Sequence, residues 1–144
     1  MNFKDRVSAF EELGVILSNS SSNPEFYKIL KLARLNNYWF TKSNVMYAIQ
    51  SLVKWLNPVT LSSFISHYNL TDSNKKIGVI IPSNIPFVGF HDFLCVLLSG
   101  NIFIGQLSSY NNVLLPYIAS LLFAINKDFK NLIFFFPILL KMQI

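Results

Sequence analysis

The sequence predicts an α/β protein, with a helical segment over residues 1–70 followed by a partial α/β segment over residues 77–144 in the order β-α-β-α-β. One observation behind this prediction is the hydrophobic pattern, which changes at Ile77 from helical spacing to short β-branched runs. Another is charge, because residues 77–144 contain only five charged side chains: Asp92, Lys127, Asp128, Lys130 and Lys141. Overall, 52% of the 144 residues are hydrophobic and 13% charged, which excludes a globally disordered chain.

Four helices are expected in the first segment, because apolar residues recur there every three to four positions. Pro24 suits the first position of a helix, and the pair Asn57–Pro58 is expected to end one. The first expected helix spans residues 5–17, and the second runs from Pro24 to the break at Asn36–Asn37. The third is capped by either Thr41 or Ser43 and runs to Leu56, and the fourth spans residues 61–68.

Three strands and two helices are expected in the second segment. The expected order is strand 77–81, helix 87–99, strand 102–107, helix 113–125 and strand 132–136. Pro82 stops the first strand, and Gly100 closes the first helix. Because the links are short, the strands are predicted to be parallel, and their apolar composition predicts burial on both faces.

Several classes of protein are disfavoured by composition. One cysteine, Cys95, excludes an internal disulfide framework, and the two histidines, His67 and His91, have no ligand spacing, so no metal site is expected. The net charge of +5 comes from scattered basic residues, so no nucleic-acid partner is expected. No run of 18 apolar residues and no secretory signal are visible, which predicts no transmembrane span and a cytoplasmic location.

The turn from Pro82 to Pro86 is the most informative segment, because it holds a single amide side chain, Asn84, between two prolines. It follows a predicted parallel strand, and open α/β sheets bind ligands at the carboxyl ends of their strands. A fixed amide there can donate to an oxygen on which negative charge develops. A purely structural turn is the alternative.

The residues from Pro82 to Gly100, PSNIPFVGFHDFLCVLLSG, resemble the acyl-CoA reductases related to the reductase of bacterial bioluminescence, within the aldehyde dehydrogenase superfamily. Arg6–Phe10 and Asn36–Thr41 are also similar, and the resemblance extends to about Phe135. It implies an aldehyde-dehydrogenase-like, Rossmann-type parallel sheet, of which this chain would hold the truncated first half.

The resemblance implies an enzyme that reduces long-chain fatty acyl-CoA, or an acyl group on a protein thioester, to fatty aldehyde with NADPH through an acyl-enzyme. Asn84 matches the asparagine that stabilises the oxyanion, and Pro82 and Ser83 match the turn at the nicotinamide. Residues 106–109 match the segment near the adenine ribose, which implies cofactor contacts by Gln106, Ser108 and Ser109. Gln106 stands where the family has a lysine, so NADP, or NAD in its place, would bind less tightly. A structural role for Gln106 is equally open.

The resemblance also implies two parts that these 144 residues do not contain, the pyrophosphate-binding glycine turn and the nucleophilic cysteine. We therefore expect a fragment that is inactive alone. Cys95 lies in an apolar helix interior, where the pKa of a thiol rises, and the adjacent His91 and Asp92 do not face each other on a helix. The alternative function is a non-enzymatic binding or scaffold module, and self-association through an exposed sheet is expected.

Overall fold

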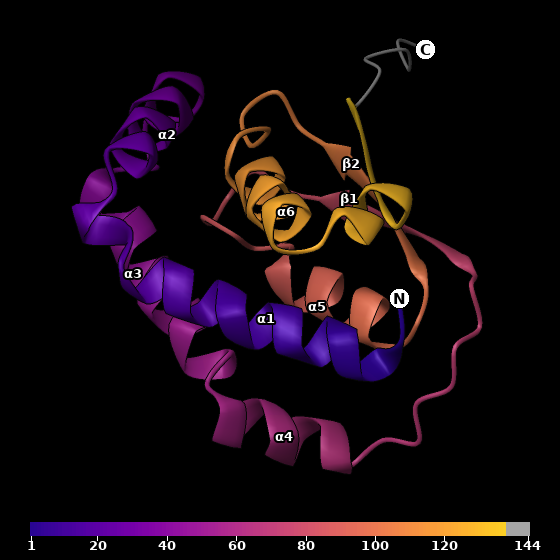
Figure 1. Cartoon of the computed structure of the whole chain (residues 1–144). Coiled ribbons are helices and arrows are strands. Elements are labelled where there is room, and N and C mark those ends of the chain that lie inside the picture. Colours follow the sequence, from indigo (N-terminus) through magenta and orange to yellow (C-terminus); the bar gives the residue numbers. More distant parts are fainter. Residues whose placement is uncertain (138–144) are drawn as a thin grey trace, which may run out of the picture.

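The computed structural model describes residues 1–137, which form a mixed α/β architecture of six α-helices, two short 3₁₀ helices and one three-stranded sheet (Figure 1). No helix in this range is both long and apolar enough to cross a membrane. In chain order the elements are α1 (Phe3–Ser18), η1 (Ser20–Ser22), α2 (Pro24–Asn36), α3 (Lys42–Trp55), α4 (Pro58–Ser66), β1 (Lys76–Ile81), α5 (Phe90–Leu98), β2 (Ile102–Leu107), α6 (Leu114–Ile125), η2 (Lys127–Asn131) and β3 (Ile133–Pro137).

The first four α-helices each begin at a side chain that caps the helix. Asn2, Asn23, Thr41 and Asn57 accept hydrogen bonds from backbone N–H groups of the first turn, at 2.8–3.2 Å. Of the two caps considered for α3, Thr41 is the one used. The predicted start of α4, at residue 61, was three residues too late, because Asn57 caps this helix and Pro58 is its first residue. Proline is well placed there, since the first helical N–H needs no partner within the helix.

The sheet has the predicted β-α-β-α-β order and is parallel throughout, with β2 between β1 and β3. Phe103 of β2 pairs with Ile77 on one side and with Ile133 on the other. Parallel neighbours need a crossover between them, which α5 and α6 supply. The third strand runs one residue later than predicted and includes Pro137. The predicted end of the domain at Ile144 lies outside the described residues.

Helix α5 begins at Phe90, three residues later than predicted. Phe87 has a φ of 59°, in the left-handed region, so the chain turns sharply there instead of continuing as a helix. Gly89 then brings the backbone against Ile81, where a Cβ atom would lie 3.0 Å from Cγ1. At the other end the prediction is confirmed, because Gly100 closes the helix with a φ of 75°.

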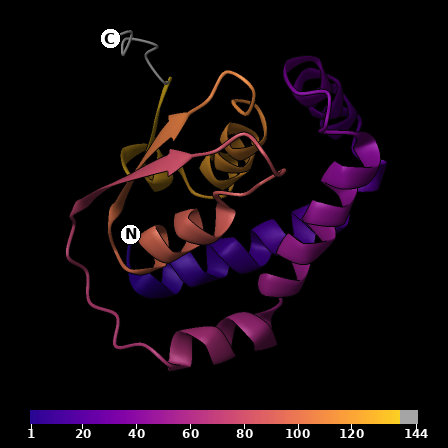
Figure 2. The ribbon, with the colours of Figure 1, turned by 180° about the vertical axis from the view of Figure 1, so that it is seen from behind.

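The core lies between the inner face of the sheet and the helices, and phenylalanine side chains connect its layers. Phe93 of α5 contacts Phe103 of β2 with ring centroids 5.0 Å apart, and Phe10 of α1 at 6.3 Å. Phe10 also contacts Phe129 of η2 at 6.1 Å. All four rings are fully buried and meet edge to face, the arrangement that aromatic pairs prefer. Helices α1 and α5 run side by side in both ribbon views (Figures 1 and 2).

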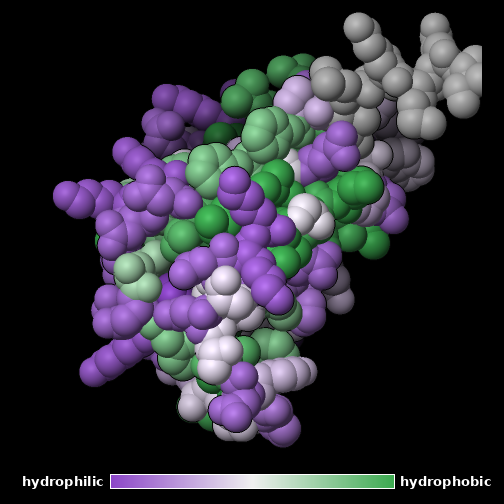
Figure 3. Space-filling view, turned by 90° about the vertical axis from the view of Figure 1, so that its right-hand side faces the viewer, coloured by the Kyte–Doolittle hydropathy of each residue, from purple (hydrophilic) through white to green (hydrophobic). Residues whose placement is uncertain are grey.

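The outer face of the sheet is uncovered within residues 1–137, so the prediction of burial on both faces was wrong, whereas the exposed sheet that was expected to promote self-association is present. Burial alternates along each strand, and the even-numbered side chains lie on the outer face. Ile80 is 73% exposed and Phe136 54% exposed. Viewed from behind, β1 and β2 lie in front with no helix over them (Figure 2). A side view shows apolar side chains reaching the surface among polar ones in the upper half of the molecule (Figure 3).

Candidate functional site

The carboxyl edge of the sheet brings together the two segments that were predicted to hold a cofactor. β1 ends at Ile81 and β2 at Leu107, and these two residues are partners in the parallel register. Pro82 and Ser108 therefore leave the sheet from adjacent strands at the same edge. The side chain of Asn111 connects the two segments, because its Nδ2 donates a hydrogen bond to the carbonyl oxygen of Pro82 at 2.7 Å.

Two buried amide side chains hold the turn that follows β1. Asn111 is 5% exposed and donates to Pro82, while Asn37 is 8% exposed and donates from Nδ2 to the carbonyl oxygen of Ser83 at 2.7 Å. Asn37 Oδ1 also accepts from the backbone N–H of Trp39 at 3.1 Å. Buried amides are expensive unless they are hydrogen-bonded, so these bonds fix the positions of two adjacent carbonyl groups. Neither amide was predicted from the sequence: Asn37 was expected only to form part of a helix break, and Asn111 lies between the expected strand 102–107 and the expected helix 113–125, where no role at the site was assigned to it.

Asn84 lies exposed on this turn, and no hydrogen bond of its side chain to residues 1–137 is found. Beside it is an open hollow of about 300 Å³, lined on the other side by Trp39 and Tyr47. Both rings are largely exposed. The amide is therefore available to a ligand, and the neighbouring rings offer flat apolar surfaces on which a ligand can lie.

Gln106 lies inside β2, so it is not part of the edge that Pro82 and Ser108 form. It is half-buried on the outer face of the sheet, in register with Ile80 and Phe136 of the flanking strands. Ser108 is half-buried, and its hydroxyl oxygen accepts a hydrogen bond from a backbone N–H two residues further on at 3.2 Å. Ser109 is exposed. The predicted residues thus lie at or near one edge of the sheet but face in more than one direction.

Cys95 is half-buried in α5, and burial, with a further contribution from the charge of Asp92, raises the pKa of its thiol above the ordinary value. The thiol therefore stays protonated near neutral pH, as the sequence predicted. What the sequence argument missed is His91, one turn earlier, whose two ring nitrogens lie 3.8 and 3.9 Å from Sγ. The spacing of four residues within one helix is the signal that would have indicated this contact.

Comparisons with known proteins found no matching family model, no matching curated protein and no matching solved structure. Within residues 1–137, no group of three His, Cys, Asp or Glu side chains is placed to hold a metal ion. The site therefore consists of an exposed amide, two immobilised carbonyl groups and neighbouring aromatic rings at the carboxyl edge of a parallel sheet.

Proposed function

We propose that this chain is the N-terminal part of an acyl-CoA reductase, which reduces fatty acyl-CoA, or an acyl-protein thioester, to fatty aldehyde with NADPH. The observation that carries the proposal is Asn84, an exposed amide on an immobilised turn at the carboxyl edge of a parallel sheet. Ligands of open α/β sheets bind at that edge. The sequence of the turn and of α5 also resembles this class of reductase.

Asn84 is proposed to donate a hydrogen bond to the thioester oxygen as negative charge develops on it. Such a donor contributes most when its position is fixed before the reaction. Here Pro82 and Pro86 restrict the turn, and the buried amides of Asn37 and Asn111 hold its carbonyl groups. Removing a single oxyanion donor costs on the order of 10²–10³ in kcat, so an Asn84→Ala substitution in the complete reductase should show a loss of that size.

NADP is the proposed cofactor, with NAD as the alternative. Pro82 and Ser83 would contact the nicotinamide end, while Gln106, Ser108 and Ser109 would contact the adenine ribose. Gln106 brings no positive charge to a ribose phosphate, so we expect weak binding. Cys95 is unsuitable as the nucleophile, because burial raises the pKa of its thiol. These 144 residues should therefore bind the nucleotide weakly and catalyse no turnover alone.

A nuclear magnetic resonance titration of the ¹⁵N-labelled chain with NADPH tests this proposal. The expected result is that backbone shifts concentrate at Ser83, Asn84, Ser108 and Ser109, with none comparable in α4. If no shifts appear, or if they concentrate elsewhere, the carboxyl edge of the sheet does not bind the nucleotide. In parallel, mixing the chain with acyl-CoA and NADPH should leave the NADPH absorbance constant, and turnover would contradict the inactive fragment.

A second function, a non-enzymatic scaffold module, is favoured by the uncovered outer face of the sheet. Parallel sheets are almost always covered on both faces, and here Ile80, Phe134 and Phe136 remain exposed. A second copy of the chain is the proposed partner, because the part of this face around Ile80, Phe134 and Phe136 is apolar and self-association removes it from water. Light scattering should show self-association that Phe136→Lys abolishes and that Val59→Lys, on the exposed side of α4, leaves unchanged. A monomer at all concentrations would rule this function out.

A further inference from the structure

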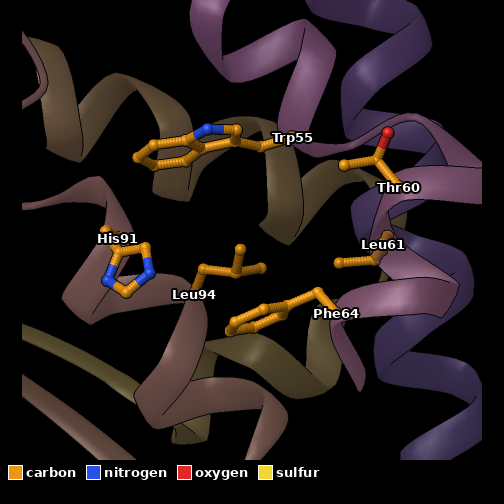
Figure 4. A pocket seen from close by; sticks show the side chains of 6 residues that line it. All are labelled: Trp55, Thr60, Leu61, Phe64, His91 and Leu94. Atoms are coloured by element: carbon orange, nitrogen blue, oxygen red, sulfur yellow. The ribbon is translucent and has the colours of Figure 1, made fainter. Parts of the chain in front are cut away.

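Away from the carboxyl edge, an open hollow of about 210 Å³ lies where the end of α3, α4 and α5 meet (Figure 4). None of the side chains that line it is an Asp, Glu, Lys or Arg. They are Trp55, Thr60, Leu61, Phe64, His91 and Leu94. The hollow shares no residue with the turn around Asn84, so an inference about it stands apart from the reductase proposal.

Three rings form the walls of the hollow, and two buried leucines form its floor. The ring of His91 lies 5.4 Å from that of Trp55 at an interplanar angle of 77°, and 6.1 Å from that of Phe64 at 64°. Leu61 and Leu94 are buried beneath them. Figure 4 shows Trp55 and Phe64 on opposite sides of the space, with His91 at one end and Thr60 near the other.

Two of the three wall residues, Trp55 and His91, are exposed and Phe64 is half-buried, whereas the leucines of the floor are buried, so the apolar lining is accessible from solvent. Trp55 is 41% exposed, although its ring also stacks on Phe90 at 6.4 Å. Ligand pockets are concave, mostly apolar and equipped with few polar groups. Here the polar groups are the ring nitrogens of His91, which also contact Cys95 Sγ at 3.8 and 3.9 Å, and the hydroxyl of Thr60, for which no hydrogen bond to residues 1–137 is found.

We propose that this hollow binds a small, uncharged aromatic molecule of one or two rings that carries a single hydrogen-bonding group. The size fits, because an apolar cavity of about 150 Å³ holds one benzene ring. The lining favours a ring over an aliphatic chain, because the ring can meet Trp55, Phe64 and His91 edge to face. A charged ligand would lose its hydration without meeting an opposite charge in the lining. Thr60 or His91 pairs with the one polar group.

The test follows the side-chain indole signal of Trp55 by nuclear magnetic resonance. The chain has two tryptophans, so Trp39→Phe leaves Trp55 as the only indole signal. Phenol and indole are expected to shift this signal saturably. Cyclohexanol, of similar size but without a ring current, should bind between about twofold and tenfold more weakly than phenol, and charged benzoate more weakly still. Absence of saturation, or cyclohexanol binding as tightly as phenol, overturns the proposal.

A pair of substitutions on α4 shows whether the ligand occupies this hollow. Thr60 lines it and is exposed, so Thr60→Phe fills the space without disturbing the core. Val59, the neighbouring residue, is exposed and does not line it, so Val59→Phe adds the same ring elsewhere on the same helix. Phenol affinity is expected to fall at least tenfold in Thr60→Phe and to stay unchanged in Val59→Phe. Equal affinities in the two variants place the ligand elsewhere and overturn the proposal.

Discussion

Two neighbouring asparagines make side-chain hydrogen bonds of the same length, one of them part-buried and the other exposed, which allows the cost of releasing the site turn to be measured. Asn111 is buried and donates to the carbonyl oxygen of Pro82 at 2.7 Å, whereas Asn112 is exposed and accepts from Asn36, also at 2.7 Å. We predict that Asn111→Ala lowers the free energy of unfolding by about 1–3 kcal/mol, because it leaves a carbonyl group without its partner. Asn112→Ala should change it by less than about 0.5 kcal/mol, because water replaces the lost bond.

The same reasoning extends to Asn37, which has two bonds to lose. Its substitution by Ala removes the donor to Ser83 and the acceptor for the N–H of Trp39, so the loss of stability should exceed that of Asn111→Ala. Because Asn37 and Asn111 hold adjacent carbonyl groups, the double variant should deviate from the sum of the single ones.

Urea unfolding followed by circular dichroism gives these free energies of unfolding, provided that the slope of free energy against urea concentration is the same in every variant. Equal losses for Asn111→Ala and Asn112→Ala would refute the reasoning, because they would mean that burial does not distinguish the two bonds. A third variant, Asn111→Asp, keeps the shape but replaces the donor by an oxygen. It should be at least as destabilising as Asn111→Ala, because two acceptors would then face each other.

Three further predictions concern packing and pH. Gly100→Ala should lower the unfolding free energy by about 1–3 kcal/mol, because φ is 75° and a Cβ atom would clash with Asp72; unchanged stability in urea would contradict this backbone geometry. Gly14→Ala should be destabilising by up to about 2 kcal/mol despite the gain in helix propensity, because its Cβ would lie 2.9 Å from that of Leu56; a higher melting temperature would refute such close packing of α1 and the end of α3. Burial raises the pKa of Cys95 above 9.0, so the unfolded thiol ionises first and stability should fall as pH rises past 9.0. In Cys95→Ala that alkaline part of the stability curve should be flatter, and an identical curve would argue against the raised pKa.

The elements that the sequence predicted well are those whose boundaries are set by local chemistry. Gly100 ends α5 because a left-handed position there favours glycine, and Thr41 starts α3 because its side chain replaces a missing partner. The start of α5 was not predictable in this way. Phe87 has a positive φ that its own chemistry disfavours, and it is buried in the core, so tertiary packing decides where the helix begins.

Burial of the sheet was mispredicted because its two faces have nearly the same composition. Ile77 and Ile80 are equally apolar, yet the first is partly covered by the helices and the second is exposed. A strand without alternating polarity indicates burial on both faces, and only the positions of the helices show which face is covered. Phe136 is likewise an apolar strand residue that is exposed because it lies on the uncovered face.

The candidate site was predictable to the extent that parallel strands share a carboxyl edge. That rule correctly brought Pro82 and Ser108 to adjacent strand ends. It gave no indication of Asn37, which reaches the turn from the end of a helix 46 residues earlier in the chain. The aromatic hollow was missed for the same reason, because Trp55 and His91 meet only once α3 and α5 have packed.

Gln106 makes cofactor binding and self-association compete for the same face of the sheet. It lies on the outer face between Ile80 and Phe136, so a second chain that covers these apolar residues also covers Gln106. A cofactor that needs Gln106 would then have to displace the partner. If both proposals are correct, the affinity for NADPH should fall as protein concentration rises, because self-association competes with binding, and Phe136→Lys should remove this dependence. An affinity that is independent of protein concentration in a chain that does self-associate would mean that Gln106 takes no part in holding the cofactor.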